Sequence, residues 1–124
     1  LTLQVSGLSV SFFVCFDLRF APEFWNAAKE TDLFIVVANW PESRRAHWKS
    51  LLKARAIENQ SYIFGVNRVG SGNGIKYSGD SYLFDPLGES IAVAPANTPT
   101  VLMGEVEKRV VTEVRKKFPF IEDR

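Results

Sequence analysis

The chain's one cysteine lies where an apolar run ends and polar residues begin. The stretch "VSFFVCFDLRF" covers residues 10–20, and Cys15 is followed within four residues by Asp17 and Arg19. A cysteine attacks as its thiolate when a neighbour lowers its pKa or takes its proton. A lone cysteine in an apolar strand is more often a small buried side chain. Both interpretations stay open on chemistry alone, although the carboxyl end of a strand is where α/β sheets place their sites.

The single histidine is the one imidazole that could serve Cys15 as a base. His47 falls in a predicted helix, beside Trp48. A cysteine–histidine pair is one known way to activate a thiol. Nothing in the spacing favours this pair, and a surface or interface role for a helical histidine is the competing interpretation.

Alternating strand and helix patterns must position these side chains. Apolar runs at residues 10–16, 33–39 and 62–69 predict strands. Helices are predicted between them, over residues 22–30, where Pro and Glu suit the first turn, and from about residue 44 to 60. Two β-α-β units imply adjacent parallel strands, so the residues that follow each strand should meet at one edge of the sheet.

The second half of the chain is predicted to extend the sheet. Residues 70–80 hold four glycines in eleven residues and predict a loop. Residues 81–94 predict two strands joined by a turn, residues 100–107 a further strand, and residues 108–118 a helix. The expected architecture is α/β, a mixed sheet with helices packed on it. Because the strands are apolar on both faces, one face should meet another layer, either more of the same protein or a second chain.

Composition limits the class of protein. A length of 124 residues fits one domain, and 15 Lys and Arg against 14 Asp and Glu give no electrostatic reason to expect nucleic acid or a membrane as partner. One cysteine excludes an internal disulfide and fits a reducing, cytoplasmic location. The chain begins at Leu1, apparently inside a strand, which predicts a piece of a longer protein.

Three blocks of sequence resemble the nitrilase superfamily of carbon–nitrogen hydrolases. They are "CFDLRFAPEFW", "NWPESRRAHWKSLLKARAIENQSYIFGVNRVG" and "GDSYLFDPLGE", and the closest resemblance is to its omega-amidase-like branch. Phe16 stands where that branch has Tyr. The resemblance implies an α-β-β-α sandwich, of which residues 1–124 would be the C-terminal portion of a single domain: half of the sandwich, a mixed β-sheet with helices packed on one face.

The resemblance also implies catalysis by a Glu, Lys, Glu and Cys set, with the cysteine at Cys15. Its thiolate would form a thioester with the substrate's acyl group, and the backbone N–H of Phe16 would help hold the oxyanion. The Glu and Lys residues of the family precede the cysteine, yet none of the fourteen residues before Cys15 is Glu or Lys. The chain alone is therefore predicted to be inactive.

Three further positions match substrate-binding positions of the family. Arg19 would bind the substrate's distal carboxylate, since a guanidinium pairs both carboxylate oxygens; its alternative role is a structural salt bridge. Trp40 would line the pocket or simply pack in the core. Ser43 would help hold the carboxylate or cap the following helix.

The predicted function is hydrolysis of the amide of a short dicarboxylate monoamide, such as 2-oxoglutaramate, to acid and ammonia. Two alternatives stay open: a hydrolase of the same family with a different amide substrate, and a non-catalytic interaction module. The expected partners are a small-molecule amide and further copies of the protein, as a homodimer or higher oligomer, with no cofactor and no metal.

Overall fold

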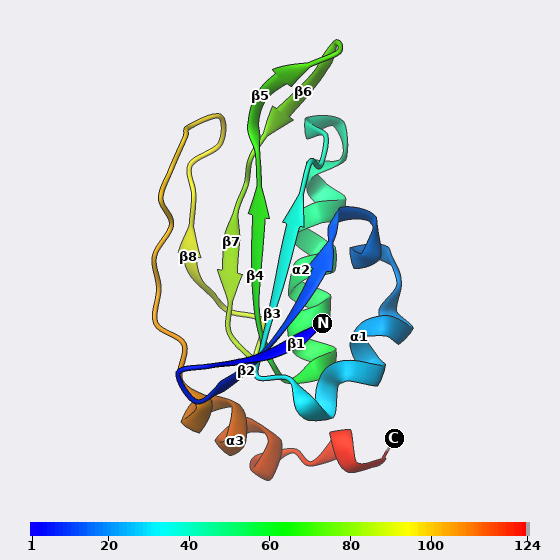
Figure 1. The fold of residues 1–124 in the computed structure, drawn as a ribbon, viewed down its shortest axis with the longest axis vertical. Coiled ribbons are helices and arrows are strands. Elements are labelled where there is room, and N and C mark those ends of the chain that lie inside the picture. The colour runs from blue at the N-terminus through cyan, green and yellow to red at the C-terminus, as the bar shows by residue number, and fades with distance from the viewer. Residues whose placement is uncertain (124) are drawn as a thin grey trace.

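A computed structural model describes residues 1–123 and shows one mixed sheet with a projecting hairpin (Figure 1). The six-stranded sheet has the order β1-β2-β3-β4-β7-β8, and β5 pairs with β6 in a separate two-stranded sheet. The strands are β1 (Thr2–Val5), β2 (Leu8–Val14), β3 (Leu33–Ala38), β4 (Tyr62–Asn67), β5 (Val69–Gly72), β6 (Ile75–Ser78), β7 (Tyr82–Phe84) and β8 (Ser90–Val93).

The centre of the sheet consists of two β-α-β units, as the sequence predicts. Strands β2, β3 and β4 are parallel neighbours, while β1, β7 and β8 join them antiparallel. The connecting helices are α1 (Ala21–Ala27), which the 3-10 turn η2 (Ala28–Glu30) continues, and α2 (Arg45–Asn59). Helix α2 ends at Gln60, whose left-handed backbone (φ 46°) closes the helix before β4 begins.

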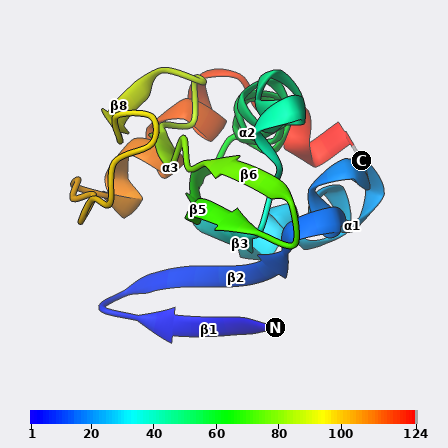
Figure 2. The ribbon, with the colours of Figure 1, turned by 90° about the horizontal axis from the view of Figure 1, so that it is seen from above.

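Helices α1 and α2 cover one face of the sheet, as predicted (Figures 1 and 2). The alternate side chains of each strand that point to this face form the main core with the helices: Phe13, Phe34, Val36, Ile63, Tyr82 and Phe84 from the strands, and Leu18, Phe24, Trp48, Leu52 and Ala56 from the turn and helices. Gly65 in β4 faces α2 so closely that a Cβ there would clash with Leu52 and lie 2.8 Å from Trp48 Cζ2. This glycine lets the helix approach the strand.

The opposite face is covered at one end only. Helix α3 (Lys108–Lys117) packs its Val111 against Val10, Leu33, Tyr62 and Leu83. Toward the carboxyl ends of the parallel strands the face stays open, and four apolar side chains are 37–61% exposed: Phe12, Val14, Val37 and Val66. The sequence-based expectation of a face that needs another layer is therefore met by an exposed apolar surface.

Two predicted elements are wrong. The glycine-rich stretch from residue 70 forms the hairpin of β5 and β6 rather than a loop, because Asn73 and Gly74, both at positive φ, build a tight turn between two short strands. Residues 100–107 form no strand. Gly104 instead crosses the face of the sheet, where a Cβ would lie 2.6 Å from Leu83 Cδ2, and Val106 packs in the core under α3.

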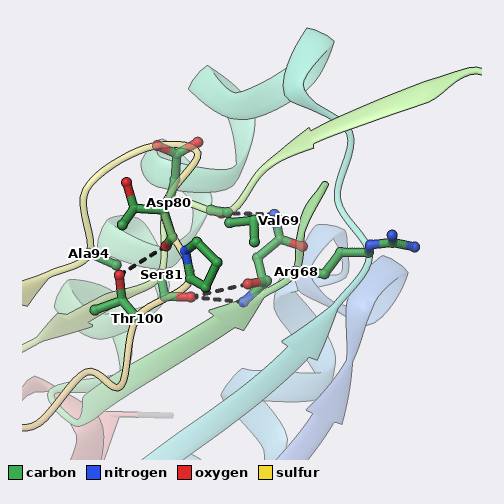
Figure 3. A pocket seen from close by; sticks show the side chains of 10 residues that line it. Arg68, Val69, Asp80, Ser81, Ala94 and Thr100 are labelled. Carbon is green, nitrogen blue, oxygen red and sulfur yellow. Dashed lines mark hydrogen bonds between the residues drawn. The ribbon is translucent and has the colours of Figure 1, made fainter. Parts of the chain in front are cut away.

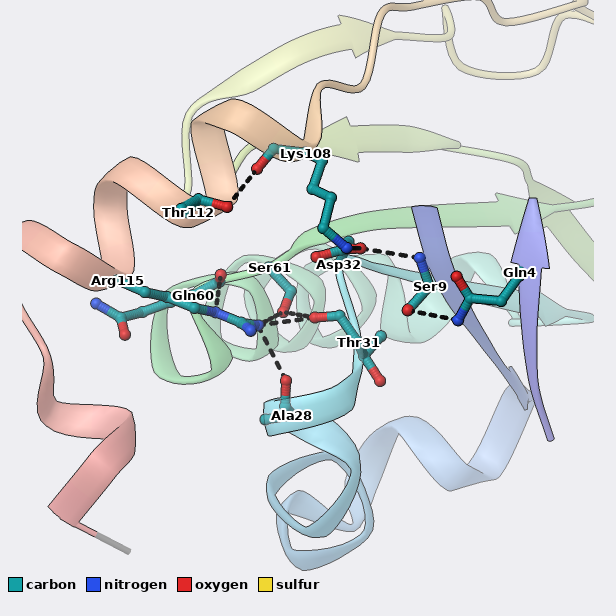
Figure 4. Close-up of polar contacts among 10 residues, drawn as sticks. All are labelled: Gln4, Ser9, Ala28, Thr31, Asp32, Gln60, Ser61, Lys108, Thr112 and Arg115. Carbon is teal, nitrogen blue, oxygen red and sulfur yellow. Dashed lines mark hydrogen bonds and ion pairs between the residues drawn. The ribbon is translucent and has the colours of Figure 1, made fainter. Parts of the chain in front are cut away.

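Arg115 holds α3 against the rest of the fold (Figure 4). Its guanidinium donates to the carbonyls of Ala28, Thr31, Asn59 and Gln60 and to Ser61 Oγ, at 2.7–3.2 Å. Burial lowers the pKa of Arg115, which the nearby carboxylates of Asp32 and Glu122 oppose. One side chain thus satisfies the carbonyls at the ends of η2 and α2.

The close approach at Gly65 generates a stability prediction. Gly65→Ala should lower the free energy of unfolding by about 1–3 kcal/mol, because an overpacked core must shift Leu52 and Trp48. Gly72→Ala is the matched control, since the nearest atom to a Cβ there is 3.6 Å away and its φ is ordinary. Urea unfolding of the two variants measures the difference; equal midpoints would show that the helix can move away without cost.

Candidate active site

Cys15 lies at a sharp turn where β2 ends. The strand stops at Val14, one residue earlier than Cys15 and two before the predicted end, and the 3-10 turn η1 (Cys15–Arg19) begins at once. Cys15 has a φ of 45°, in the left-handed region that a non-glycine residue enters at a cost of about 1–3 kcal/mol. Asp17 Oδ2 accepts the N–H of Val14 at 2.9 Å and closes the turn. Backbone strain of this kind clusters at functional sites.

A cavity of about 330 Å³ opens beside Cys15. It is formed where β2 and β3 both end, because the carboxyl ends of parallel strands meet at one edge of the sheet. The residues that line it are Cys15, Phe16, Arg19, Asn39, Trp40, Pro41 and Arg44. Four of the five predicted site residues thus share this cavity: Cys15, Phe16, Arg19 and Trp40.

The guanidinium of Arg19 lies over an aromatic ring in this cavity. Its guanidinium carbon is 4.9 Å from the centroid of Trp40, a cation–π arrangement. His47 Nδ1 lies 3.4 Å from Arg19 Nη2 and can accept its N–H in the tautomer protonated at Nε2. The remaining guanidinium donors stay available to an anion in the cavity, and no acidic residue pairs with Arg19 among residues 1–123.

Trp40 itself is fixed from several directions. Asn67, at the end of β4, accepts the Trp40 N–H at 2.7 Å and donates to the Trp40 carbonyl at 3.0 Å. The indole Nε1–H donates to the Arg44 carbonyl at 2.9 Å, and the ring packs on Trp48 with a centroid separation of 5.4 Å. The residue is 4% exposed, so Trp40 both packs in the core and lines the pocket, which were the two alternatives for it.

Two residues singled out from the sequence lie elsewhere. Ser43 lines a neighbouring cavity with Glu42, Arg45 and Lys76, and it does not cap α2, because it sits inside the 3-10 turn η3 (Glu42–Arg44) that precedes the helix. Its predicted part in substrate binding stays a prediction. His47 does not line the cavity of Cys15, and its ring contacts Arg19 instead. A catalytic pair of Cys15 and His47 has no support from this geometry.

Sequence reasoning missed Asn39, Asn67 and Arg44. Asn39 O lies 3.8 Å from Cys15 Sγ, within reach of a weak S–H donor. The available signal was topological: Asn39 directly follows β3, as Cys15 follows β2, and Asn67 is the last residue of β4. Arg44 offered no such signal, since the adjacent Arg45 looks the same in sequence.

A second cavity, of about 280 Å³, lies behind the end of β4 (Figure 3). Ser81 and Thr100 point into it, whereas the guanidinium of Arg68 points away and stacks over Tyr77 at 4.5 Å. Ser81 Oγ accepts the N–H of Asn67 at 3.0 Å, so this region supports the residue that fixes Trp40.

Among residues 1–123, the cavity of Cys15 has no side chain that could act as a general base toward the thiol. Its lining holds two arginines and neither a carboxylate nor a lysine. No group of three or more His, Cys, Asp or Glu side chains that could hold a metal occurs in the described part of the chain. No helix within residues 1–123 is both long and apolar enough to cross a bilayer. The cavity therefore combines a partly exposed thiol with two arginines and, from the described residues, offers no side chain that could act as a general base.

The support of Trp40 by Asn67 generates a prediction. Asn67→Asp keeps an acceptor for the Trp40 N–H but loses the donors to the carbonyls of Trp40 and Gly79, which are 3.0 and 2.8 Å away. Unfolding should become easier by about 2 kcal/mol, because unsatisfied part-buried carbonyls are costly. Urea unfolding followed by tryptophan fluorescence measures it. Asn73→Asp, in the exposed hairpin turn, is the control; if both variants match the parent protein, Asn67 does not hold Trp40.

Comparison with known proteins places this site in a family. The model of the carbon-nitrogen hydrolase family matches residues 2–116. Omega-amidase YafV of Escherichia coli K12 is 50% identical over 111 residues, which cover 89% of this chain and 43% of that protein. The 2-oxoglutaramate amidase of Bacillus subtilis is 34% identical, over 97% of this chain and 46% of its own length.

A solved structure agrees with these relatives. A CN-hydrolase superfamily protein from Xanthomonas campestris, with an arsenic adduct in its active site, superposes with a TM-score of 0.91 at 36% identity, over 100% of this chain and 49% of its own. The chain spans about half the length of the relatives it matches. The family match, over residues 2–116 of this chain, gives no support to the predicted placement in the C-terminal half. The fold and the family model together show that the chain belongs to the carbon-nitrogen hydrolase family.

Proposed function

We propose that residues 1–124 form the nucleophile-bearing part of an omega-amidase-type hydrolase. The observation that carries this proposal is the joint placement of Cys15, at a strained turn, and Arg19, over the ring of Trp40, in one cavity. The similarity to omega-amidase and 2-oxoglutaramate amidase supports the same substrate class. The substrate would be the amide of a short dicarboxylate monoamide.

In the proposed reaction the Cys15 thiolate attacks the amide carbon and forms a C–S bond. The C–N bond then breaks, the nitrogen takes up a proton and ammonia leaves, so that a thioester remains. Water attacks the thioester carbon, the C–S bond breaks, and the acid is released with the thiol restored. Cys15 is half-buried at the cavity, which leaves its sulfur accessible to a substrate.

The oxyanion that forms during each attack needs hydrogen-bond donors. The backbone N–H of Phe16 lies in the first turn of η1, where amide groups have no acceptor within the helix. Loss of one such donor typically raises the barrier by about 3 kcal/mol. A lysine from outside residues 1–124 would supply the second donor, and a glutamate from the same part would take the thiol proton.

Arg19 would bind the carboxylate at the far end of the substrate. Its guanidinium lies at the opposite end of η1 from Cys15, and both line the cavity. The cation–π contact with Trp40 holds the guanidinium in place, so less side-chain freedom would be lost when a carboxylate pairs with its N–H groups. A substrate held at this end would present its amide to the sulfur.

Two alternatives are distinguished by the same site. A hydrolase acting on an uncharged amide would use Cys15 but gain nothing from Arg19. A non-catalytic interaction module would need neither residue. Cys15 has a strained backbone, and Arg19 contacts the Trp40 ring without an ion pair to an acidic residue among residues 1–123. This arrangement favours the omega-amidase type over both alternatives.

Removal of Arg19 tests the carboxylate site. In the complete hydrolase, Arg19→Ala should lower kcat/KM for 2-oxoglutaramate by about 30-fold or more, because a charge-assisted pair contributes roughly 2 kcal/mol. Turnover of an uncharged amide of similar length should hardly change. Ammonia release measures both activities, and Cys15→Ala gives the background.

Arg68→Ala is the matched control, since Arg68 also stacks on an aromatic ring, Tyr77, outside the cavity of Cys15. An Arg19→Ala protein with unchanged 2-oxoglutaramate turnover would contradict the carboxylate role. Residues 1–124 alone should release no ammonia; release at enzymatic rates would contradict the need for a glutamate and a lysine from elsewhere.

The exposed face of the sheet gives a second prediction, on assembly. We propose that the rest of the hydrolase covers the open surface that includes Val37 and Val66, which are 45% and 42% exposed. Residues 1–124 alone should therefore self-associate. Light scattering should show less association for the Val37→Lys, Val66→Lys double variant, whereas Ile75→Lys in the hairpin, 43% exposed, should leave association unchanged. If residues 1–124 form a monodisperse monomer, the prediction is wrong.

A further inference from the structure

We infer that Arg44 is a second cationic arm of the Cys15 cavity and helps the protein to select substrates that carry a carboxylate. Arg44 lines the cavity together with Arg19, so two arginines contribute to the lining of a volume of about 330 Å³. The inference rests on the proposed function for the identity of the substrate, but the attraction of anions to the cavity is a separate property.

The backbone of Arg44 is fixed to the same tryptophan that supports Arg19. Its carbonyl accepts the indole Nε1–H of Trp40 at 2.9 Å, and its N–H donates to the carbonyl of Pro41 at 3.0 Å. Trp40 therefore sets the position of Arg19 through its ring face and the position of Arg44 through its ring edge. Both arginines are therefore held by the side chain of Trp40, which is itself fixed in the core.

The neighbouring Arg45 forms an ion pair and does not line the cavity of Cys15. Its guanidinium pairs with the buried carboxylate of Asp80 at 2.6 Å, away from the cavity of Cys15. Arg44 has no ion pair with an acid within residues 1–123. One arginine of this adjacent pair is thus used to anchor the start of α2, and the other keeps its charge for the cavity.

Two guanidinium groups match the needs of a 2-oxo acid better than one. A carboxylate offers about four acceptor sites, and a single planar guanidinium satisfies two of them. Arg19 already directs one donor toward His47. Arg44 would supply donors for the remaining carboxylate sites or for the adjacent oxo group, and an uncharged substrate would leave two unpaired cations in the cavity. Discrimination against uncharged amides follows.

Alkylation of Cys15 can test this without any amidase activity. The Cys15 sulfur displaces iodide from iodoacetate, an anion, or from iodoacetamide, its neutral isostere; a C–S bond forms and iodide leaves. Because Cys15 is the one cysteine of residues 1–124, mass analysis of its peptide reports both rates. The ratio of the two rates measures how strongly the cavity attracts an anion.

Arg44→Gln should lower the iodoacetate-to-iodoacetamide ratio at least about fivefold at low salt, as loss of a charge at a few ångströms predicts. Arg44→Lys, which keeps the charge, should retain most of the ratio and shows that packing is intact. Lys49→Gln is the control, because it removes a charge from α2, the helix that directly follows Arg44, but lies at a different cavity, with Ser50 and Tyr82.

An unchanged ratio in Arg44→Gln, or an equal fall in Lys49→Gln, would overturn the role of Arg44. If Arg19→Gln lowers the ratio while Arg44→Gln does not, Arg19 alone makes the anion site and the proposed function stands. If the ratio falls as expected but the complete protein does not hydrolyse 2-oxoglutaramate, the anion-selective cavity stands and the proposed substrate is wrong.

Discussion

The site depends on the immobilisation of Trp40. Asn67 clamps its backbone from the end of β4, and the ring rests on Trp48 of α2. Arg19 lies on its face, and the Arg44 carbonyl binds its edge. An arginine free in solvent would lose much side-chain entropy on binding an anion, up to about 2 kcal/mol. By stacking Arg19 in advance, the fold meets part of that cost during folding rather than during binding.

The two faces of the sheet differ in how closely they are packed. The face under α1 and α2 is closely packed, to the point that β4 needs Gly65 opposite Leu52, and this rigidity holds the ends of β2, β3 and β4 in register. Those ends carry Cys15, Trp40 and Asn67 into contact range. The other face contributes nothing to this alignment where Val14 and Val37 are exposed. The geometry of the site is therefore set by the packed face, without help from the exposed one.

Much of this fold could be predicted from local pattern, and much of the site could not. The three parallel strands and both crossover helices follow from apolar periodicity, and β2 is misjudged only at its ends. The hairpin of β5 and β6 was not predicted, because its glycines lie in two short paired strands and the tight turn between them rather than in a loop. Residues 100–107 have the composition of a strand but pack across a face of the sheet. Cys15 and Arg19 share a motif, so the sequence identifies them together. The hydrogen-bond partners of Trp40 depend on where distant segments meet, and so does the ion pair of Arg45 that Arg44 lacks within residues 1–123. No local pattern encodes such contacts.

Selection of the substrate and activation of the thiol are physically separable in this arrangement. Every group that would recognise a carboxylate is held by contacts within residues 1–123, through Trp40, Asn67 and η1. The group that would take the thiol proton has no counterpart in the cavity lining. In the proposed hydrolase, recognition of the carboxylate and removal of the thiol proton would therefore depend on different parts of the protein, because the cavity lining within residues 1–123 supplies cationic groups for the first and no carboxylate or lysine for the second.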